Sequence, residues 1–403
     1  MNKRKIALII LLLFCVVFES ETIIYAEKAS YVSYENDNNN NNDIYGNKLP
    51  KEVTLYFNNI YNEAIEVAIY AEMIDTNINI SDTVIGKGFV IYDEETEENN
   101  IWYFPIYYNN EIVTIIKVLY LNNELTYQIS DEFVEQLNEL EYNVTDILFK
   151  FNDEIYCIKE NNFTYCISYG RTEKVNTFKT YNEIEYYISN QYITPVLKVN
   201  YLNNNSNYAR TYNAVKDING GKQCIMSNCF VKQYDYRICW AASVATIVRY
   251  SNSVYVNEGL NAFDVAMYYA YENDLSTNPN DQPNAFQGAS VYDAQYMLAL
   301  YGVYYSVLSR KLSYNEIKDE IDHGYPIYMS SAYYNENKVR SGHATVLYGY
   351  YTLFGKKFFK IWNPGSGSEE LACYNSSGDI CYTYNGVNYA WERSICKATY
   401  VFK

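Results

Sequence analysis

The run of residues from Cys239 to Tyr250 constrains the fold more than any other part of this chain. Its sequence, Cys-Trp-Ala-Ala-Ser-Val-Ala-Thr-Ile-Val-Arg-Tyr, is mostly small and apolar, which predicts a buried helix with Cys239 in its first turn. Such a helix has to be covered by another layer of secondary structure. The free N–H groups and the partial positive charge at a helix start favour thiolate over thiol, so this position predicts a lowered pKa for Cys239.

Three further polar residues occur in contexts that complement a sulfur nucleophile. His343 lies in Ser-Gly-His-Ala-Thr-Val-Leu-Tyr-Gly, which predicts a core strand that holds the imidazole rigidly. Asn363 follows one hairpin later, where a strand ends at Pro364, and its amide can accept from the imidazole N–H and fix the tautomer. Gln233 lies six residues before Cys239, so its NH2 group can join the Cys239 N–H in holding an oxyanion. Together these residues predict cleavage of an acyl bond.

Each of these residues also has an ordinary structural explanation. Free cysteines are often small buried residues, a Gly-His-Ala sequence on a strand is more often structural, and Asn-Pro-Gly is a common turn. The order and spacing of the four residues favour catalysis over these alternatives. The chain has only two histidines, and His323 ends a segment, 313–323, that begins with a capping box and stops at Gly324. The helix dipole alone explains His323, which leaves His343 as the candidate base.

These residues resemble the papain-like cysteine peptidases, and in particular their small secreted bacterial members. The resemblance rests on Gln-x5-Cys-Trp-Ala, Gly-His-Ala and Trp-Asn-Pro-Gly, and it covers residues 224–403. It implies that Gln233 is an oxyanion donor, Cys239 the nucleophile, His343 the base and Asn363 the residue that orients the base. It also implies an α+β fold, in which the helix that carries Cys239 packs against an antiparallel sheet that carries the base and the orienting residue.

The sequence departs from the papain pattern in two places. Tyr236-Arg237-Ile238 precedes the nucleophile, where papain and the cathepsins have a Cys-Gly-Ser/Ala pattern. His343 and Asn363 follow Cys239 by 104 and 124 residues, which is shorter than the usual spacing. A trimmed relative is implied, so substrate pockets do not carry over. Trp362 is expected either to cover the hydrogen bond between His343 and Asn363 or to be a core residue.

The first 26 residues have the features of a secretory signal peptide. Residues 1–5 are positively charged, residues 6–18 are apolar, and Ala26 offers a cleavage site. The apolar run is too short to span a bilayer comfortably. No second run of that kind follows, so we expect no integral membrane span in the mature chain. Phe14 before Cys15 fits a lipoprotein site poorly. The sequence therefore predicts a protein that is secreted or loosely attached to the cell surface.

The mature length of about 377 residues predicts two domains. Residues 27–222 carry about 30 acidic and 14 basic side chains, whereas residues 223–403 carry about 16 and 14, so the N-terminal half holds nearly all the net negative charge. We expect a flexible Asn-rich linker at 27–52, a mainly β domain at 53–202, a second linker at 203–222 and the peptidase domain at 223–403. Without a basic patch, nucleic acid is not expected as a partner.

The N-terminal half lacks a constellation of His, Cys and carboxylate groups, so we expect no second enzyme there. Its position predicts an intramolecular prodomain that covers the cleft until the linker at 203–222 is cut. The alternative is a permanent adhesion or substrate-binding module. Asn109-Asn110 and Asn161-Asn162 predict two hairpins, Pro105 predicts that its strand lies at a sheet edge, and 130–140 is a candidate helix.

Eight cysteines remain after removal of the signal peptide, and their spacing predicts three disulfides. The predicted pairs are Cys157 with Cys166, Cys373 with Cys381, and Cys224 with Cys229. The first two pairs are equidistant from predicted hairpin turns, and an oxidising extracellular setting would keep them bonded. Cys239 and Cys396 remain, and a nucleophile has to be free. Zinc is the competing use, but Cys-x4-Cys and Cys-x7-Cys do not fit structural zinc sites, and the predicted chemistry needs no metal or cofactor.

The sequence therefore predicts a secreted cysteine endopeptidase, made as a zymogen, whose substrates are polypeptides. A cell-wall amidase or a transglutaminase-like acyl transferase uses the same Cys–His chemistry, but commonly with Asp or His as the third residue. A leader peptidase domain of bacteriocin exporters is disfavoured by the signal peptide and by the lack of membrane spans. A non-catalytic surface binding protein, whose papain-like domain only binds, is the alternative from another class.

Overall fold

The computed structural model of the chain contains one antiparallel sheet that runs through most of the molecule. The residues that the structure describes are 49–93, 100–121, 123–143, 145–151, 154–159, 161, 163–175, 181–184, 218–225, 227–234, 237–334, 338, 340–374 and 378–398. The predicted signal peptide and most of the predicted linker at 203–222 lie outside the described residues.

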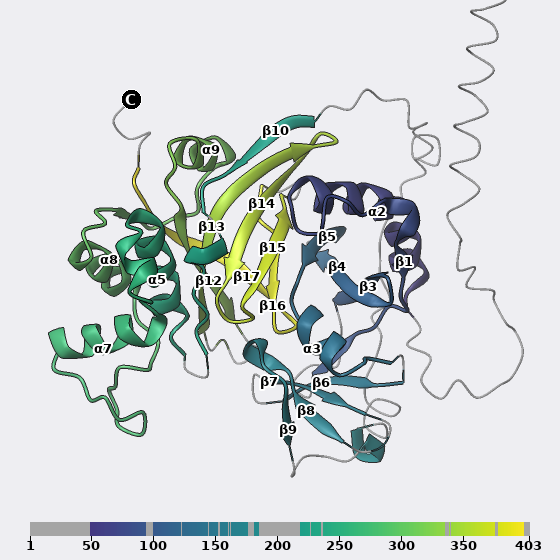
Figure 1. Cartoon of the computed structure of the whole chain (residues 1–403), viewed down its shortest axis with the longest axis horizontal. Helices are drawn as coiled ribbons and strands as arrows, with labels where there is room; N and C mark the ends of the chain where they lie inside the picture. Colours follow the sequence, from purple (N-terminus) through teal and green to yellow (C-terminus); the bar gives the residue numbers. More distant parts are fainter. Residues whose placement is uncertain are drawn as a thin grey trace, which may run out of the picture.

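The large sheet has twelve described strands, in the order β1-β3-β4-β5-β15-β14-β13-β12-β17-β11, with β10 beside β13 and β16 beside β17 (Figure 1). Four of the strands come from the N-terminal half: β1 (Val84–Ile85), β3 (Ile101–Tyr108), β4 (Glu111–Leu121) and β5 (Glu124–Ser130). The others are β10 (Ile218–Gln223), β11 (Ser306–Leu308), β12 (Ile327–Tyr334), β13 (Arg340–Leu353), β14 (Lys356–Asn363), β15 (Ser368–Cys373), β16 (Tyr382–Tyr384) and β17 (Val387–Cys396).

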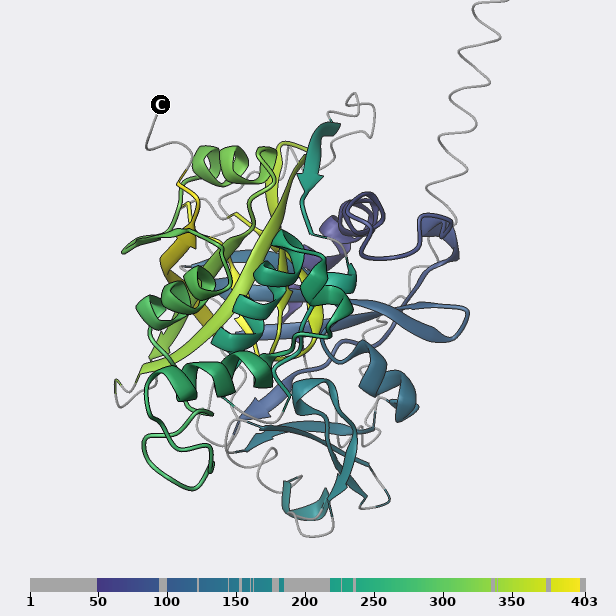
Figure 2. The same cartoon turned by 60° about the vertical axis from the view of Figure 1, so that its left-hand side comes forward.

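Helices cover both faces of the C-terminal strands. The helices α5 (Cys239–Ser251), α7 (Ala262–Glu272) and α8 (Val291–Leu300) share a core with Val346 of β13, and the short α6 (Val254–Asn257) follows α5. The helix α9 (Tyr314–Asp322) packs with Leu347, the next residue of β13, and therefore on the opposite face. Figure 2 shows the green helices of residues 239–300 in front of the sheet.

The helix α2 (Lys51–Tyr70) covers the N-terminal strands. Its buried residues Val53, Phe57, Ile60 and Ala64 recur at spacings of three and four, which is the stripe that an amphipathic helix buries. Phe57 stacks on Phe104 of β3, with ring centroids 3.9 Å apart. The same core continues under β13, β14 and β15 of the C-terminal half.

A second, five-stranded sheet lies on the other face of β3 and β4, where it shares a core with them. Its order is β2-β6-β7-β8-β9, with β2 (Ile91–Asp93), β6 (Ile147–Phe151), β7 (Glu154–Ile158), β8 (Thr164–Cys166) and β9 (Glu173–Val175). The helix α3 (Val134–Glu139) joins that core through Leu137. Three short 3-10 helices complete the named elements: η1 (Ile80–Asp82), η2 (Ser168–Gly170) and η3 (Ser227–Cys229).

The two halves of the chain meet at the seam between β5 and β15. These strands pair through Ser130 with Glu370, Ile129 with Leu371 and Gln128 with Ala372. One hydrogen-bonded sheet therefore includes strands from both predicted domains.

The predicted α+β fold and the mainly β character of the N-terminal region are confirmed. The hairpin at Asn109-Asn110 joins β3 to β4, and α3 lies inside the segment 130–140. The predicted linker at 27–52 extends too far, because α2 begins at Lys51.

The prediction that Pro105 marks an edge strand is wrong. β1 pairs with β3 next to Pro105, and the Gly86 N–H donates to the Pro105 carbonyl at 2.8 Å. In an extended strand the nitrogen and the carbonyl of one residue face the same neighbour, so the Pro105 nitrogen also faces β1. Proline has no N–H to return this hydrogen bond, and β1 ends at Ile85, directly before Gly86.

The predicted opposition of Cys157 and Cys166 is also wrong, by one residue. Cys157 lies opposite Tyr165, and Cys166 lies opposite Tyr156. The connection runs from 159 to 163, five residues rather than a two-residue turn, and a slip of one residue points the two thiols to opposite faces. No disulfide links any of the eight described cysteines.

The opposition of Cys373 and Cys381 is found as predicted, although both thiols are free. The Cys381 N–H donates to the Cys373 carbonyl at 3.1 Å, and Tyr374 bridges to Ile380. Gly378 has a φ of +77°, the left-handed conformation that the turn requires.

Candidate active site

Cys239 is the first residue of α5, and no side chain caps this end of the helix. The helix packs closely because its residues include Ala241, Ala242 and Ala245, all fully buried. Trp240 fixes the first turn by donating from Nε1 to the Gln287 carbonyl at 3.1 Å. The helix start thus has a defined orientation toward the sheet.

The expected lowering of the Cys239 pKa is wrong. Burial raises the pKa of the Cys239 thiol, and the backbone N–H groups of Ala344, Trp240 and Cys239 that reach the sulfur offset this only in part. The desolvation of a thiolate at this depth therefore outweighs the favourable helix start. Contact with the Ala344 N–H also places the sulfur beside the residue that follows His343.

His343 lies on β13 and is 6% exposed. Its Nε2 lies 2.9 Å from Asn363 Oδ1, and the same oxygen accepts from the Gly365 N–H at 3.0 Å. A backbone N–H can only donate, so this oxygen is an acceptor and Nε2 carries the imidazole proton. Nδ1 is then the unprotonated nitrogen. Burial lowers the pKa of His343 to about 4, and the hydrogen bond to Asn363 opposes that shift.

Aromatic rings enclose His343. The Tyr384 ring stacks on the imidazole with centroids 4.5 Å apart and planes at 17°, and the Tyr382 and Tyr389 rings lie at 6.3 and 5.7 Å. Gly365 lies beside both rings: a Cβ there would lie 2.5 Å from Tyr384 Oη and 3.1 Å from His343 Cε1. Only glycine leaves room for both rings, which explains the glycine of the Asn-Pro-Gly turn.

Sequence reasoning did not identify Tyr384. The chain has 49 tyrosines, so one more tyrosine carries no signal. The following Asn385-Gly386 is a strong hairpin signal and could have located the turn between β16 and β17. Nothing in the sequence indicates that this hairpin lies over His343.

Gln233 is anchored to the turn that follows Asn363. Its backbone N–H donates to the Pro364 carbonyl at 2.9 Å, and its side chain is buried. Trp362 reinforces this contact by donating from Nε1 to the Val231 carbonyl at 3.0 Å. The Trp362 ring also stacks on Phe230, with centroids 4.3 Å apart, so Trp362 is a core residue. The ring that packs against His343 is Tyr384 instead.

One cavity of about 570 Å³ brings the predicted residues together. Gln233, Cys239 and His343 line it, and Asn363 lies behind the imidazole with no exposure. Arg237 and Arg340 also line the cavity, as does Lys150 of β6, which reaches it from the N-terminal half.

His323 lies elsewhere, at the C-terminal end of α9. Its Nδ1 is 2.7 Å from the Asp319 carbonyl, and its side chain is 48% exposed. The capping box at Ser313 and the turn at Gly324 are both present, as the sequence predicted.

In the described part of the chain, no three His, Cys, Asp or Glu side chains gather as a metal site. None of the helices described is long and apolar enough to cross a membrane.

Comparison with known proteins matches residues 227–390 to the model of the Peptidase_C39 like family. Among solved structures, a C39-like peptidase from Bacillus anthracis is 16% identical, with a TM-score of 0.24. The match covers 37% of this chain and 97% of that one. Among curated proteins, none matches. The range matched by the family contains Gln233, Cys239, His343 and Asn363.

Proposed function

The chain is a member of the papain-like cysteine peptidase superfamily, and on that basis we propose that it is a secreted endopeptidase. In this proposal Cys239 is the nucleophile, His343 the base, Asn363 the residue that orients the base and Gln233 an oxyanion donor. One observation carries it: the thiol, the imidazole and the glutamine amide line a single cavity, with Asn363 bonded behind the imidazole.

The reaction starts from an uncharged pair, because the pKa of Cys239 is raised and that of His343 is lowered to about 4. As the sulfur attacks the peptide carbonyl carbon, its proton passes to His343 Nδ1. The Cys239 N–H and the Gln233 NH2 group hold the oxyanion. Asn363 Oδ1 accepts from Nε2 and stabilises the imidazolium as it forms.

The second half of the reaction restores the enzyme. The imidazolium donates its proton to the leaving amine, the C–N bond breaks, and an acyl thioester on Cys239 remains. Water then attacks the thioester while His343 takes a proton from it. The C–S bond breaks, and the sulfur regains its proton from His343.

The proposed site of action is outside the cell, and the support for it is the charged and apolar pattern of residues 1–26. Sequencing the N-terminus of the protein recovered from culture medium tests this. We expect the product to begin at Glu27, and retention of the full chain in the cells would contradict it.

Residues 51–175 are proposed to remain attached to the enzyme, rather than to leave as a prodomain. Two observations support the permanent alternative: β5 is hydrogen-bonded to β15, and α2 shares its core with Tyr351, Phe358 and Leu371. Burial of an apolar side chain stabilises by about 2 kcal/mol. Release of α2 and β5 would therefore cost several kcal/mol, a large part of the stability of an ordinary domain.

Peptide hydrolysis by the purified protein and by Cys239→Ala tests the proposed activity. Loss of the nucleophile should lower turnover by several orders of magnitude with little effect on stability. Cys229→Ala is the matched control, because Cys229 packs in the same core as α5 and is outside the cavity. Hydrolysis above about a tenth of the wild-type rate in Cys239→Ala would remove Cys239 from the mechanism. Activity on wall fragments alone would favour the amidase alternative.

A further inference from the structure

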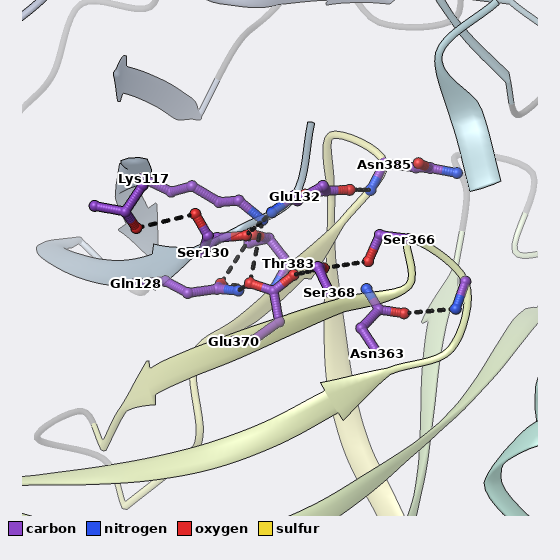
Figure 3. Close-up of polar contacts among 12 residues, drawn as sticks. Lys117, Gln128, Ser130, Glu132, Asn363, Ser366, Ser368, Glu370, Thr383 and Asn385 are labelled. Atoms are coloured by element: carbon purple, nitrogen blue, oxygen red, sulfur yellow. Dashed lines mark hydrogen bonds and ion pairs between the residues drawn. The ribbon is translucent and has the colours of Figure 1, made fainter. Parts of the chain in front are cut away.

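A network of buried polar side chains lies where the N-terminal strands meet β15 (Figure 3). Lys117 of β4 pairs with Glu132 and, at 3.5 Å, with Glu370 of β15, and all three side chains are fully buried. Gln128 of β5 donates to Glu370 Oε2 at 2.5 Å. A buried ion pair adds little net stability compared with apolar residues of similar volume. The ion pairs therefore explain little of the stability, and the role of the network has to be sought in the backbone groups that its side chains hold.

Two members of the network hold the backbone of the hairpin between β16 and β17. Gln128 Oε1 accepts from the Thr383 N–H at 3.1 Å and from the Thr383 hydroxyl at 3.0 Å. Glu132 Oε1 accepts from the Asn385 N–H at 3.2 Å. The two N–H groups flank Tyr384, so side chains from the N-terminal half fix the backbone on both sides of this residue.

The network also reaches the turn that carries Asn363. Ser368 donates from its hydroxyl to Glu370 Oε1 at 3.2 Å, and the Ser366 and Ser368 hydroxyls are 2.5 Å apart. Figure 3 shows this chain of contacts leading from Glu370 to the loop that begins at Asn363. One set of buried groups thus holds two loops.

These two loops meet at the imidazole. Tyr384 stacks on His343 from the hairpin, while Gly365 of the other loop approaches Tyr384 Oη and His343 Cε1 so closely that no side chain fits. A displacement of either loop would separate Tyr384 from the imidazole and admit water.

We propose that Gln128 and Glu132, supported by Lys117 and Glu370, are positioning residues that hold Tyr384 against His343. These residues thereby determine the environment of the base, although none of them lines the cavity. The inference rests on the proposed function only in giving His343 the role of base.

The consequence concerns the hydration of His343. Burial is the cause of its lowered pKa, so a loosened Tyr384 should raise that pKa toward the ordinary value. The other titratable or charged groups that line the cavity or stack near the imidazole are Cys239, Lys150, Arg237, Arg340, Tyr328, Tyr333, Tyr382, Tyr384 and Tyr389. The proposed variants alter none of them.

Histidine NMR of the full chain can measure this effect directly, because the protein has only His323 and His343. Protein labelled at histidine Cε1 gives one signal for each, and the signal of His343 is followed against pH. In Gln128→Met, which removes both hydrogen-bonding ends of the glutamine, the pKa of His343 should rise by about one unit or more. Turnover should fall by about tenfold with little change in KM, since the ground-state contacts of the substrate remain.

The matched control is Glu63→Gln, which alters another contact between the same two halves of the chain. Glu63 of α2 bonds to Lys356 of β14 at 2.6 Å and does not touch the hairpin. Glu63→Gln should leave the pKa of His343 unchanged.

A folded Gln128→Met protein with an unshifted His343 pKa would overturn the proposal, as would equal shifts in Gln128→Met and Glu63→Gln. If Gln128→Met does not fold, Thr383→Val decides, because it removes only the hydroxyl contact with Gln128. A smaller upward shift in Thr383→Val supports the proposal, and no shift overturns it. The titration needs no substrate, so a wrong assignment of the activity would leave this result intact.

Discussion

His343, with its pKa lowered to about 4, determines how the proposed reaction begins. An imidazole that is neutral at pH 7 cannot pair with a thiolate, and the raised pKa of Cys239 keeps that thiol protonated. The base therefore has to act during the attack on the carbonyl, not before it. Asn363 contributes by holding the proton on Nε2, which keeps Nδ1 free to accept.

The pH dependence of Cys239 alkylation tests this account of the resting state. Iodoacetamide reacts with the thiolate, so its rate should rise with pH to and beyond about 8.5, the ordinary thiol pKa. No plateau should occur between about pH 4 and pH 8, where a thiolate–imidazolium pair would be stable. His343→Ala should slow alkylation near pH 7, because the neutral imidazole takes the thiol proton during the attack, but it should neither create nor remove a plateau. A fast plateau at pH 5 that this variant abolishes would establish a preformed ion pair.

Gln233 is expected to contact only the charge that develops during the reaction. Gln233→Ala should therefore lower turnover by about 10² to 10³ and change KM little, which is the scale for one oxyanion donor. Its backbone contact with the Pro364 carbonyl does not need the side chain and should survive. Steady-state kinetics with a soluble peptide distinguishes the outcomes: a rise in KM at constant turnover would exclude Gln233 from the oxyanion site.

Local sequence patterns predicted single elements well, at the scale of helices and strands. The apolar run at Cys239 is the buried α5, and the β-branched run after His343 is the core strand β13. Register proved harder, because it depends on connection length. The segment between Cys157 and Cys166 was predicted to turn over two residues, and the five-residue connection moved every pair by one.

Contacts between distant segments could not be predicted from local pattern at all. Gln128 and Glu370 are 242 residues apart, and the pairing of their strands has no signal in either segment alone. The stacking of Tyr384 on His343 depends on that pairing. Gln233, Cys239 and His343, which local pattern selected, line one cavity with Asn363 bonded behind the imidazole, but the rings and buried charges that surround them were not predicted.

The two cysteine hairpins give a prediction about register. Mild oxidation of the folded protein should link Cys373 to Cys381, since directly opposed residues have Cα atoms about 5.5 Å apart, which suits a disulfide. It should not link Cys157 to Cys166, whose thiols point to opposite faces. Peptide mapping without reduction identifies the pairs. Recovery of the Cys157–Cys166 pair from folded protein would refute the register of β7 and β8.

For the whole molecule, a permanent N-terminal module and a removable prodomain predict opposite effects of cutting the chain, because β5 is paired with β15. A truncated chain that begins at Lys222 would leave β15 as an unpaired edge and expose the core that α2 covers, including Tyr351, Phe358 and Leu371. We expect it to be poorly folded and less active than the full chain. A cut introduced between 203 and 217 should instead leave the two pieces associated and the rate unchanged.

The zymogen account predicts the reverse of both results. The truncated chain from Lys222 would be more active than the full chain, and the separated N-terminal piece would inhibit it when added back. Rates of peptide hydrolysis by the full chain, the cut chain and the truncated chain, together with gel filtration of the cut chain, decide between the two accounts.

Active-site labelling decides whether Cys239, activated by His343, performs peptide hydrolysis. The full chain is treated with a peptidyl epoxide, and the modified residue is identified by mass spectrometry while the remaining peptidase activity is measured. We predict that Cys239 alone is alkylated, that one label per molecule abolishes activity, and that His343→Ala slows labelling at pH 7 whereas His323→Ala does not. Label on another cysteine, or stoichiometric label on Cys239 with activity retained, would contradict the account.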